Sequence, residues 1–131
     1  MEFNCKRSEK GYTEEYEMKI TLASGSQKAK VYLDDRDLDQ SDVYGKQVVK
    51  SVTLARPNIV ILIDASFEPE NVMGVSYPAG TVSTQIMLDP VSGKLKKVEK
   101  IQGGILGEAI GNGTHLSEEV CLPSKMPYRT K

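Results

Sequence analysis

The sequence predicts an antiparallel all-β domain of seven or eight strands, a meander that closes into a barrel or a curled sandwich. Apolar and polar side chains alternate along several short segments, as in a strand with one buried and one wet face. Turn residues separate these segments at intervals of about 8–12 residues, a spacing typical of closed all-β folds. A run of five aliphatic residues at 59–63, IVILI, is too short for a buried helix and suits a strand.

The size and composition of the chain fit one domain. Its 131 residues are 39% hydrophobic and 27% charged, which argues against disorder. We expect a single domain over 1–131, with a polar N-terminal arm at 1–12 and a C-terminal tail at 122–131. The net charge of −1 gives no electrostatic argument for nucleic acid. No apolar run approaches the ~20 residues of a membrane-spanning helix, so no membrane span is expected.

The two cysteines, Cys5 and Cys121, lie near opposite ends of the chain. Their separation excludes the close cysteine pairs of redox and zinc motifs. It suits a disulfide between terminal strands, which would stabilise the fold by ~4–5 kcal/mol, with two unrelated free thiols as the alternative. A disulfide indicates an oxidising compartment, so we expect a periplasmic or secreted protein. The first ten residues contain no signal-peptide core, but they can be the mature end of an exported chain.

The clearest alternation predicts a β-hairpin over 14–22 and 28–33. The first strand places four apolar side chains on one face: Tyr16, Met18, Ile20 and Leu22. The stretch ASGS at 23–26 supplies the turn.

An acidic stretch, DDRDLDQSD, follows this hairpin at 34–42. Asp35, Asp37 and Asp39 alternate as the ligands of a calcium loop do. The mid-loop glycine and the terminal glutamate of an EF-hand are missing, and Arg36 lies in the middle. We predict a solvated acidic loop and no metal site, with calcium binding as the alternative.

Two neighbouring strands are predicted at 46–55 and 57–67. The first places three apolar side chains on one face: Val48, Val52 and Leu54. Lys50 interrupts that face and indicates a β-bulge. The second strand contains the aliphatic run at 59–63 and ends near Asp64. Because the run is apolar throughout, we expect a central strand with both faces covered.

A second hairpin is predicted over 82–88 and 94–101. Between its strands lies DPVSG at 89–93, with proline and glycine where a tight turn needs them. The return strand carries four lysines: Lys94, Lys96, Lys97 and Lys100. They predict an exposed or edge strand, and attraction of an anionic partner is the alternative interpretation.

Few residues offer catalytic or metal chemistry. His115 is the only histidine, and no second histidine or close cysteine pair completes a transition-metal site. The chain lacks a GxSxG motif, and His115 follows the glycine-rich stretch 103–113, so we interpret it as an ordinary loop residue. Asp64 is interpreted as a strand-ending residue that caps a turn. Asp64 and His115 are therefore weak site candidates only; no catalytic residue and no cofactor is predicted, and we do not expect an enzyme.

Three segments follow a common layout. They are a hydrophobic-x-Cys strand at Phe3-Asn4-Cys5, a strand pair with the sequence IMLDPVSGKL at 86–95, and a final Val120-Cys121. This layout resembles small exported bacterial β-barrel-like proteins of uncharacterised function. The resemblance covers the two ends and one hairpin, and it implies an exported β protein but no shared activity. The glycine-rich stretch before Cys121 is longer here than in that pattern.

These observations predict a non-catalytic binding module of the bacterial cell envelope or periplasm. It would hold a small apolar ligand in a barrel mouth or a protein partner on an exposed face, and an oligomer is compatible with it. Strand alternation without a catalytic set of residues motivates this prediction. The alternative is a structural or assembly protein with no ligand, and a small hydrolase-type enzyme using Asp64 or His115 ranks last.

Overall fold

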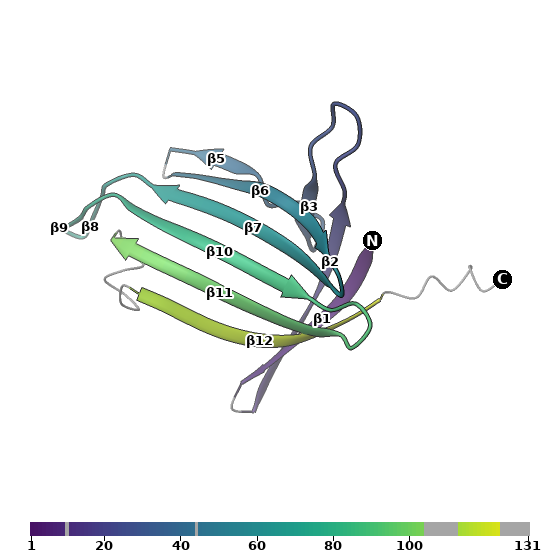
Figure 1. Cartoon of the computed structure of the whole chain (residues 1–131). Coiled ribbons are helices and arrows are strands. Elements are labelled where there is room, and N and C mark those ends of the chain that lie inside the picture. The colour runs from purple at the N-terminus through teal and green to yellow at the C-terminus, as the bar shows by residue number, and fades with distance from the viewer. Residues whose placement is uncertain (10, 44, 104–112, 124–131) are drawn as a thin grey trace.

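The fold is all-β, and its main antiparallel sheet is nearly closed into a barrel (Figure 1). The computed structural model describes residues 1–9, 11–43, 45–103 and 113–123. The strands are β1 (Glu2–Glu9), β2 (Tyr12–Thr21), β3 (Lys30–Leu33), β4 (Arg36–Asp37), β5 (Gln40–Asp42), β6 (Gly45–Ala55), β7 (Asn58–Phe67), β8 (Glu70–Val72), β9 (Val75–Tyr77), β10 (Gly80–Leu88), β11 (Lys94–Gly103) and β12 (Gly113–Pro123). The prediction of an all-β barrel is thus confirmed. The described residues form twelve strands instead of seven or eight, because two stretches expected as loops contain short strands.

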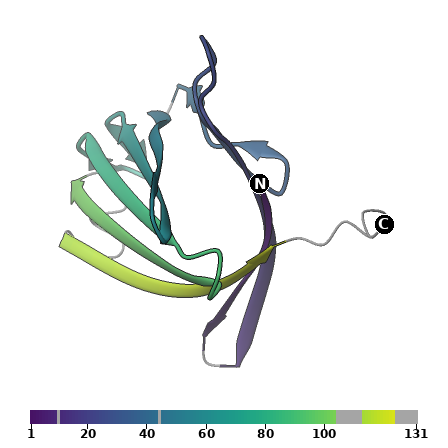
Figure 2. The same ribbon diagram turned by 45° about the vertical axis from the view of Figure 1, so that its right-hand side comes forward.

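The sheet has the order β4-β3-β2-β1-β12-β11-β10-β7-β6-β5, and β8 and β9 form a separate hairpin. Its strands follow the chain as a meander, and pairing of β1 with β12 joins the two ends of that meander. The sheet curls until its two edge strands, β4 and β5, lie at a residual seam (Figure 2). Among the described residues no helix is long and apolar enough to cross a membrane.

The hydrophobic core lies on the inward face of the curled sheet. It is formed by Phe3, Cys5, Met18, Ile20, Val31, Val49, Ile59, Ile61, Ile63, Ile86, Leu88, Leu95 and Cys121. The expectation that β7 is covered on both faces is wrong. Ile61 is fully buried, whereas Leu62 is 38% exposed. The wall is a single sheet, so the outward residues of the aliphatic run meet solvent even though the run looks uniform in sequence.

Strand β6 contains the predicted bulge, a register shift between Val49 and Ser51. The predicted inward face is wrong before the bulge, where Val49 is buried instead of Val48. After the bulge, Leu54 pairs with the buried Ile59 and lies on the inward face, although it is 54% exposed near the end of the strand. The extra residue at Lys50 moves the alternation by one position, so residues before and after it obey different parities.

Both predicted hairpins are present, as β2–β3 and β10–β11. In the second turn, Asp89 Oδ1 accepts the N–H groups of Val91 and Ser92 at 2.9 and 3.3 Å. Gly93 follows with φ +81, and a Cβ there would lie 2.9 Å from the carbonyl oxygen of Cys121. Strand β11 is not an edge: it lies between β10 and β12, and its lysines are accessible because the wall is one layer thick.

The two ends of the chain take part in the sheet. Residues 2–9 of the expected arm form β1, and residues 122–123 of the expected tail end β12. The remainder of that tail, 124–131, and residues 104–112 of the glycine-rich stretch lie outside the described residues.

Candidate functional site

Strands β1 and β12 pair only near the termini and then separate. Their register runs from Phe3↔Pro123 to Lys6↔Val120. Beyond Lys6, β1 pairs with β2 alone, and the β1–β2 hairpin points away from the barrel wall (Figures 1 and 2). Before Val120, β12 pairs with β11 alone within the described part of the chain. We call the point of separation at Lys6 and Val120 the fork.

A disulfide fixes the base of the fork. Cys5 and Cys121 are bonded, and they occupy paired register positions directly beside Lys6↔Val120. Both are buried, with 1% and 0% exposure. The predicted disulfide is therefore present, and it is compatible with an oxidising extracellular compartment.

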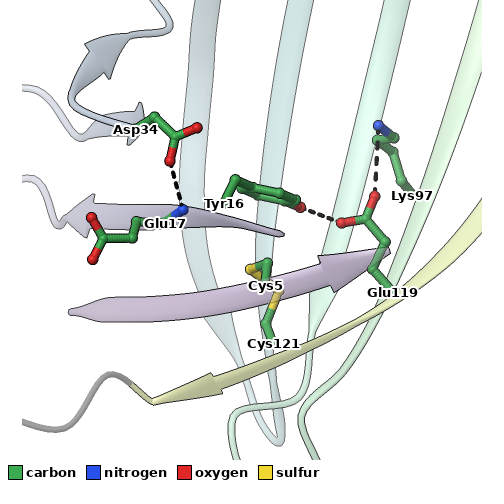
Figure 3. Close-up of a disulfide and its surroundings, with 7 residues drawn as sticks. All are labelled: Cys5, Tyr16, Glu17, Asp34, Lys97, Glu119 and Cys121. Carbon is green, nitrogen blue, oxygen red and sulfur yellow. Dashed lines mark hydrogen bonds and ion pairs between the residues drawn. A yellow bond between two sulfur atoms is a disulfide. The ribbon is translucent and has the colours of Figure 1, made fainter. Parts of the chain in front are cut away.

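Behind the fork lies a partly buried polar cluster of Tyr16, Lys97 and Glu119 (Figure 3). The Glu119 side chain is only 3% exposed, and its Oε1 accepts the hydroxyl of Tyr16. Lys97 Nζ lies 4.0 Å from Glu119 Oε2. Burial and then the hydrogen bond to Glu119 raise the pKa of Tyr16 above its ordinary value. The hydroxyl therefore stays protonated and serves as a permanent donor to the carboxylate.

This cluster was not predicted from the sequence, although the sequence contains a signal for it. Glu119 is two positions before Cys121, so a strand that buries Cys121 also turns Glu119 inward. Tyr16 was placed correctly on the apolar face of its strand. The pairing of Tyr16 with Glu119 joins residues 103 positions apart and needs the β1–β12 closure, which the local pattern does not contain.

A groove of about 530 Å³ opens at the fork. We call it the fork groove; it is lined by Lys6, Ser8, Lys94, Leu95, Lys96, Glu118, Glu119 and Val120. Within the described chain, none of the ion pairs involves Lys6, Lys94 or Lys96. The Glu119 carboxylate is engaged by the Tyr16–Lys97–Glu119 cluster, and the other lining carboxylate, Glu118, lies opposite Lys96 in the register. Beside the groove, the exposed Glu15 lies opposite Lys6, so three lysines stand against two exposed carboxylates. The groove is therefore positively charged.

Among the residues that the structure describes, no strand pairs with the far side of β12 along the groove, and we call this the open edge of β12. Cys121 donates its N–H to the carbonyl of Gly93 on the β11 side, at 2.6 Å. Ladder hydrogen bonds alternate between the two sides of an antiparallel strand. In the part of β12 before the fork, the N–H and C=O groups that point away from β11 are therefore those of Thr114, Leu116 and Glu118.

The two weak site candidates are far apart. Asp64 lies on the convex face of β7, beside a shallow depression, and its Oδ2 is 3.4 Å from Lys50 Nζ. His115 lies on the concave face of β12, half-buried and opposite Glu99 in the register. Strands β10 and β11 separate them, and they occupy opposite faces of the sheet. The structure does not bring them together into one site.

The acidic stretch has a structural position that was not predicted. Asp39 is 18% exposed; its Oδ1 accepts the N–H of Val49 at 2.7 Å, and its Oδ2 lies 2.9 Å from Lys30 and 3.2 Å from Lys28. Asp37 binds Lys30 at 2.7 Å. The prediction of a solvated loop is wrong for Asp39, because these groups join β3 to β6 across the barrel seam. We call these four charged residues, Lys28, Lys30, Asp37 and Asp39, the aspartate seam.

The groups around the aspartate seam favour the charged form of its two carboxylates. Burial raises the pKa of Asp39, but the Val49 N–H and the two ammonium groups outweigh it, so the net pKa is lowered. The hydrogen bond from Lys30 lowers the pKa of Asp37 in the same way. Lysines thus neutralise two of the three carboxylates that resembled calcium ligands, those of Asp37 and Asp39. No group of three or more His, Cys, Asp or Glu side chains among the described residues is arranged to hold a metal ion.

Comparisons of the chain with protein-family models, with curated proteins and with solved structures found no match.

Proposed function

We propose that the protein is a non-catalytic binding module of an oxidising compartment, such as the bacterial periplasm, and that it binds a protein partner at the fork groove. The observation that carries the proposal is the edge of β12 that no other described strand covers, beside a groove with three lysines for which the described residues provide no ion pair. Open edges are places where another chain pairs easily, and natural proteins usually block them. The buried disulfide supports the assignment to an oxidising compartment.

The fork suits a polypeptide better than a small apolar ligand. Apolar ligands bind in concave, mostly apolar pockets. The inward apolar side chains here pack against one another as the core, and the fork groove is an open hollow bordered by charge. Leu116 and Val120 of β12 are 75% and 49% exposed beside it. A strip of apolar side chains with a charged border is typical of a protein-binding surface.

The structural alternative places a second copy of this chain at the same edge. It shares the open edge of β12 with the proposed function and differs in the partner. The enzyme alternative gains no support from Asp64 and His115, which lie on opposite faces of the sheet.

Site-specific photo-crosslinking in cells that produce the protein tests the proposal. A photoreactive amino acid replaces Leu116 in one variant and Met73, which is 98% exposed at the β8–β9 turn, in a matched control. We expect one protein adduct from position 116 and none from position 73. The adduct partner is then purified and titrated against wild-type protein and a Lys6→Ala/Lys96→Ala variant. Weaker binding by the variant is expected; equal binding by both, or equal adducts from both positions, would overturn the proposal.

A further inference from the structure

We infer that the partner binds by adding an extended, acidic strand to the open edge of β12. This inference rests on the proposed function and specifies the mode of binding and the chemistry of the partner. The mode follows from the backbone of β12, and the chemistry follows from the side chains around the fork groove.

The backbone of the open edge offers a ladder for one more strand. Thr114, Leu116 and Glu118 each direct one donor and one acceptor away from β11. A strand placed beside them pairs with these groups at the usual inter-strand spacing of about 4.8 Å. The stretch THLSEE at 114–119 contains no proline or lysine, the residues that most often block such edges. The neighbouring β1–β2 hairpin points away and leaves the approach open (Figure 2).

The side chains on the convex face select the residues of the added strand. Alternate residues of that strand point to this face, next to Leu116 and Glu118 of β12. The exposed side chain of Leu116 favours an apolar residue opposite it. Toward the base of the fork the added strand reaches Lys6, while Lys94 and Lys96 lie one strand further along the wall. Three lysines against the two exposed carboxylates of Glu15 and Glu118 leave an excess of positive charge at the base of the fork, which favours an acidic residue there.

The same charges argue against a second copy of this chain as the occupant. Two identical edges that pair by two-fold symmetry bring the same surface together twice. In an antiparallel pairing centred on Leu116, Glu118 of each copy lies opposite Thr114 of the other, at the end of the edge far from the other copy's Lys6. A second copy therefore brings no carboxylate to the lysines of the fork groove. A different protein with an acidic, extended segment supplies one.

Synthetic peptides test the inference directly. The probe is an eight-residue peptide in which valine and glutamate alternate. It is compared with a valine–lysine peptide and with a valine–glutamate peptide whose alternate amides are N-methylated along one edge. Binding is followed by fluorescence polarisation, and amide hydrogen exchange of Thr114, Leu116 and Glu118 reports the new ladder. We expect the first peptide to bind and to protect these amides, and the other two to bind at least roughly ten-fold more weakly.

A proline variant separates the edge from the rest of the sheet. Leu116→Pro removes an N–H that points to the open side, and it leaves the ladder between β11 and β12 intact. The matched control, Leu116→Ala, keeps that N–H and removes most of the side chain. We expect Leu116→Pro to lose binding of the valine–glutamate peptide by roughly ten-fold more than Leu116→Ala does. Equal losses in the two variants would count against strand addition.

The outcomes distinguish the inference from the proposed function. If the N-methylated peptide binds as well as its parent peptide, strand addition is wrong. The proposed function still stands in that case when position 116 crosslinks to a partner. If the valine–lysine peptide binds better than the valine–glutamate peptide, the acidic chemistry is wrong. Because the peptide controls use wild-type protein, they decide the question even if Leu116→Pro does not fold.

Discussion

The barrel wall is interrupted at two places. Side chains bridge one interruption, and the other is left unbridged. At the aspartate seam, the edges formed by β3–β4 and β5–β6 lack a shared backbone ladder, yet side chains join them. Asp39 bonds to Val49 and to two lysines, and Gln47 Nε2 donates to the carbonyl of Leu38 at 2.7 Å. At the fork, β1 and β12 share a ladder and a disulfide at the base, but beyond Lys6 they separate.

This difference shows that side chains join two sheet edges at the aspartate seam, where no backbone ladder does so. A few side-chain contacts join the two edges of the seam. Along the open edge of β12, the side chains that border the gap are Leu116 and exposed charges, which make no such bridge. The fork is therefore the part of the wall that is arranged to accept another strand. The predictions below test this contrast from the largest expected effect to the smallest.

Removal of the disulfide should have the largest effect. In the chain-entropy model, Cys5→Ser/Cys121→Ser loses a crosslink across 116 positions, and the free energy of unfolding falls by about 4–5 kcal/mol. Guanidinium denaturation of the oxidised wild type and of the variant measures this. Reduced wild-type protein is the control and should match the variant. A loss below about 1 kcal/mol would mean that the four-residue ladder alone holds the base of the fork.

Loss of Asp39 should have the next largest effect. Asp39→Ala leaves the Val49 N–H without its acceptor and removes the ion pair of Lys28, while Lys30 keeps Asp37, which should cost about 1–3 kcal/mol in urea denaturation. Asp35→Asn, at an exposed position of the same stretch, is the matched control and should change little.

The Asp39 effect should also depend on pH. The folded-state pKa of Asp39 is lowered below its ordinary value of 3.8. Its contribution is therefore present above pH ~4 and is lost as the pH falls through the folded-state pKa. The stability difference between wild type and Asp39→Ala should shrink below pH 4. A difference that stays constant down to pH 2 would contradict the assigned role of the carboxylate.

A smaller loss is expected from Tyr16→Phe, which removes the hydroxyl donor to Glu119. The buried carboxylate then keeps only Lys97, at 4.0 Å, and the free energy of unfolding should fall by about 1–2 kcal/mol. The folded-state pKa of Tyr16 is raised above 10.0, so its contribution is present below pH ~10 and is lost at higher pH. Stability measured from pH 8 to 11 should therefore fall more steeply for wild type than for Tyr16→Phe. Parallel curves would show that the hydroxyl does not support the carboxylate.

The two interruptions also show which features of the fold the sequence could predict and which it could not. Alternation placed Met18, Ile20 and Leu95 on their faces, and the turn residues located the hairpin around Gly93. These features depend on residues that are close in sequence. The roles of Asp39 and Glu119 depend on partners in distant strands, which a local pattern does not contain. The open edge of β12 was missed for the same reason, because it results from where β1 leaves the sheet.

The smallest effect is expected in the continuous wall, at the sequence-based candidate Asp64. Its contact with Lys50 is 3.4 Å long, and the two side chains are 52% and 59% exposed. Exposed ion pairs of this kind contribute about 0.2–1 kcal/mol, so Asp64→Asn should change the free energy of unfolding by at most about 0.5 kcal/mol. Binding of the valine–glutamate peptide should also stay unchanged, since β7 lies away from the fork. The two measurements on Lys50→Ala provide the matched control. If Asp64→Asn alone weakened peptide binding, the functional surface would extend across the convex face to β7, and the fork would be only one end of it.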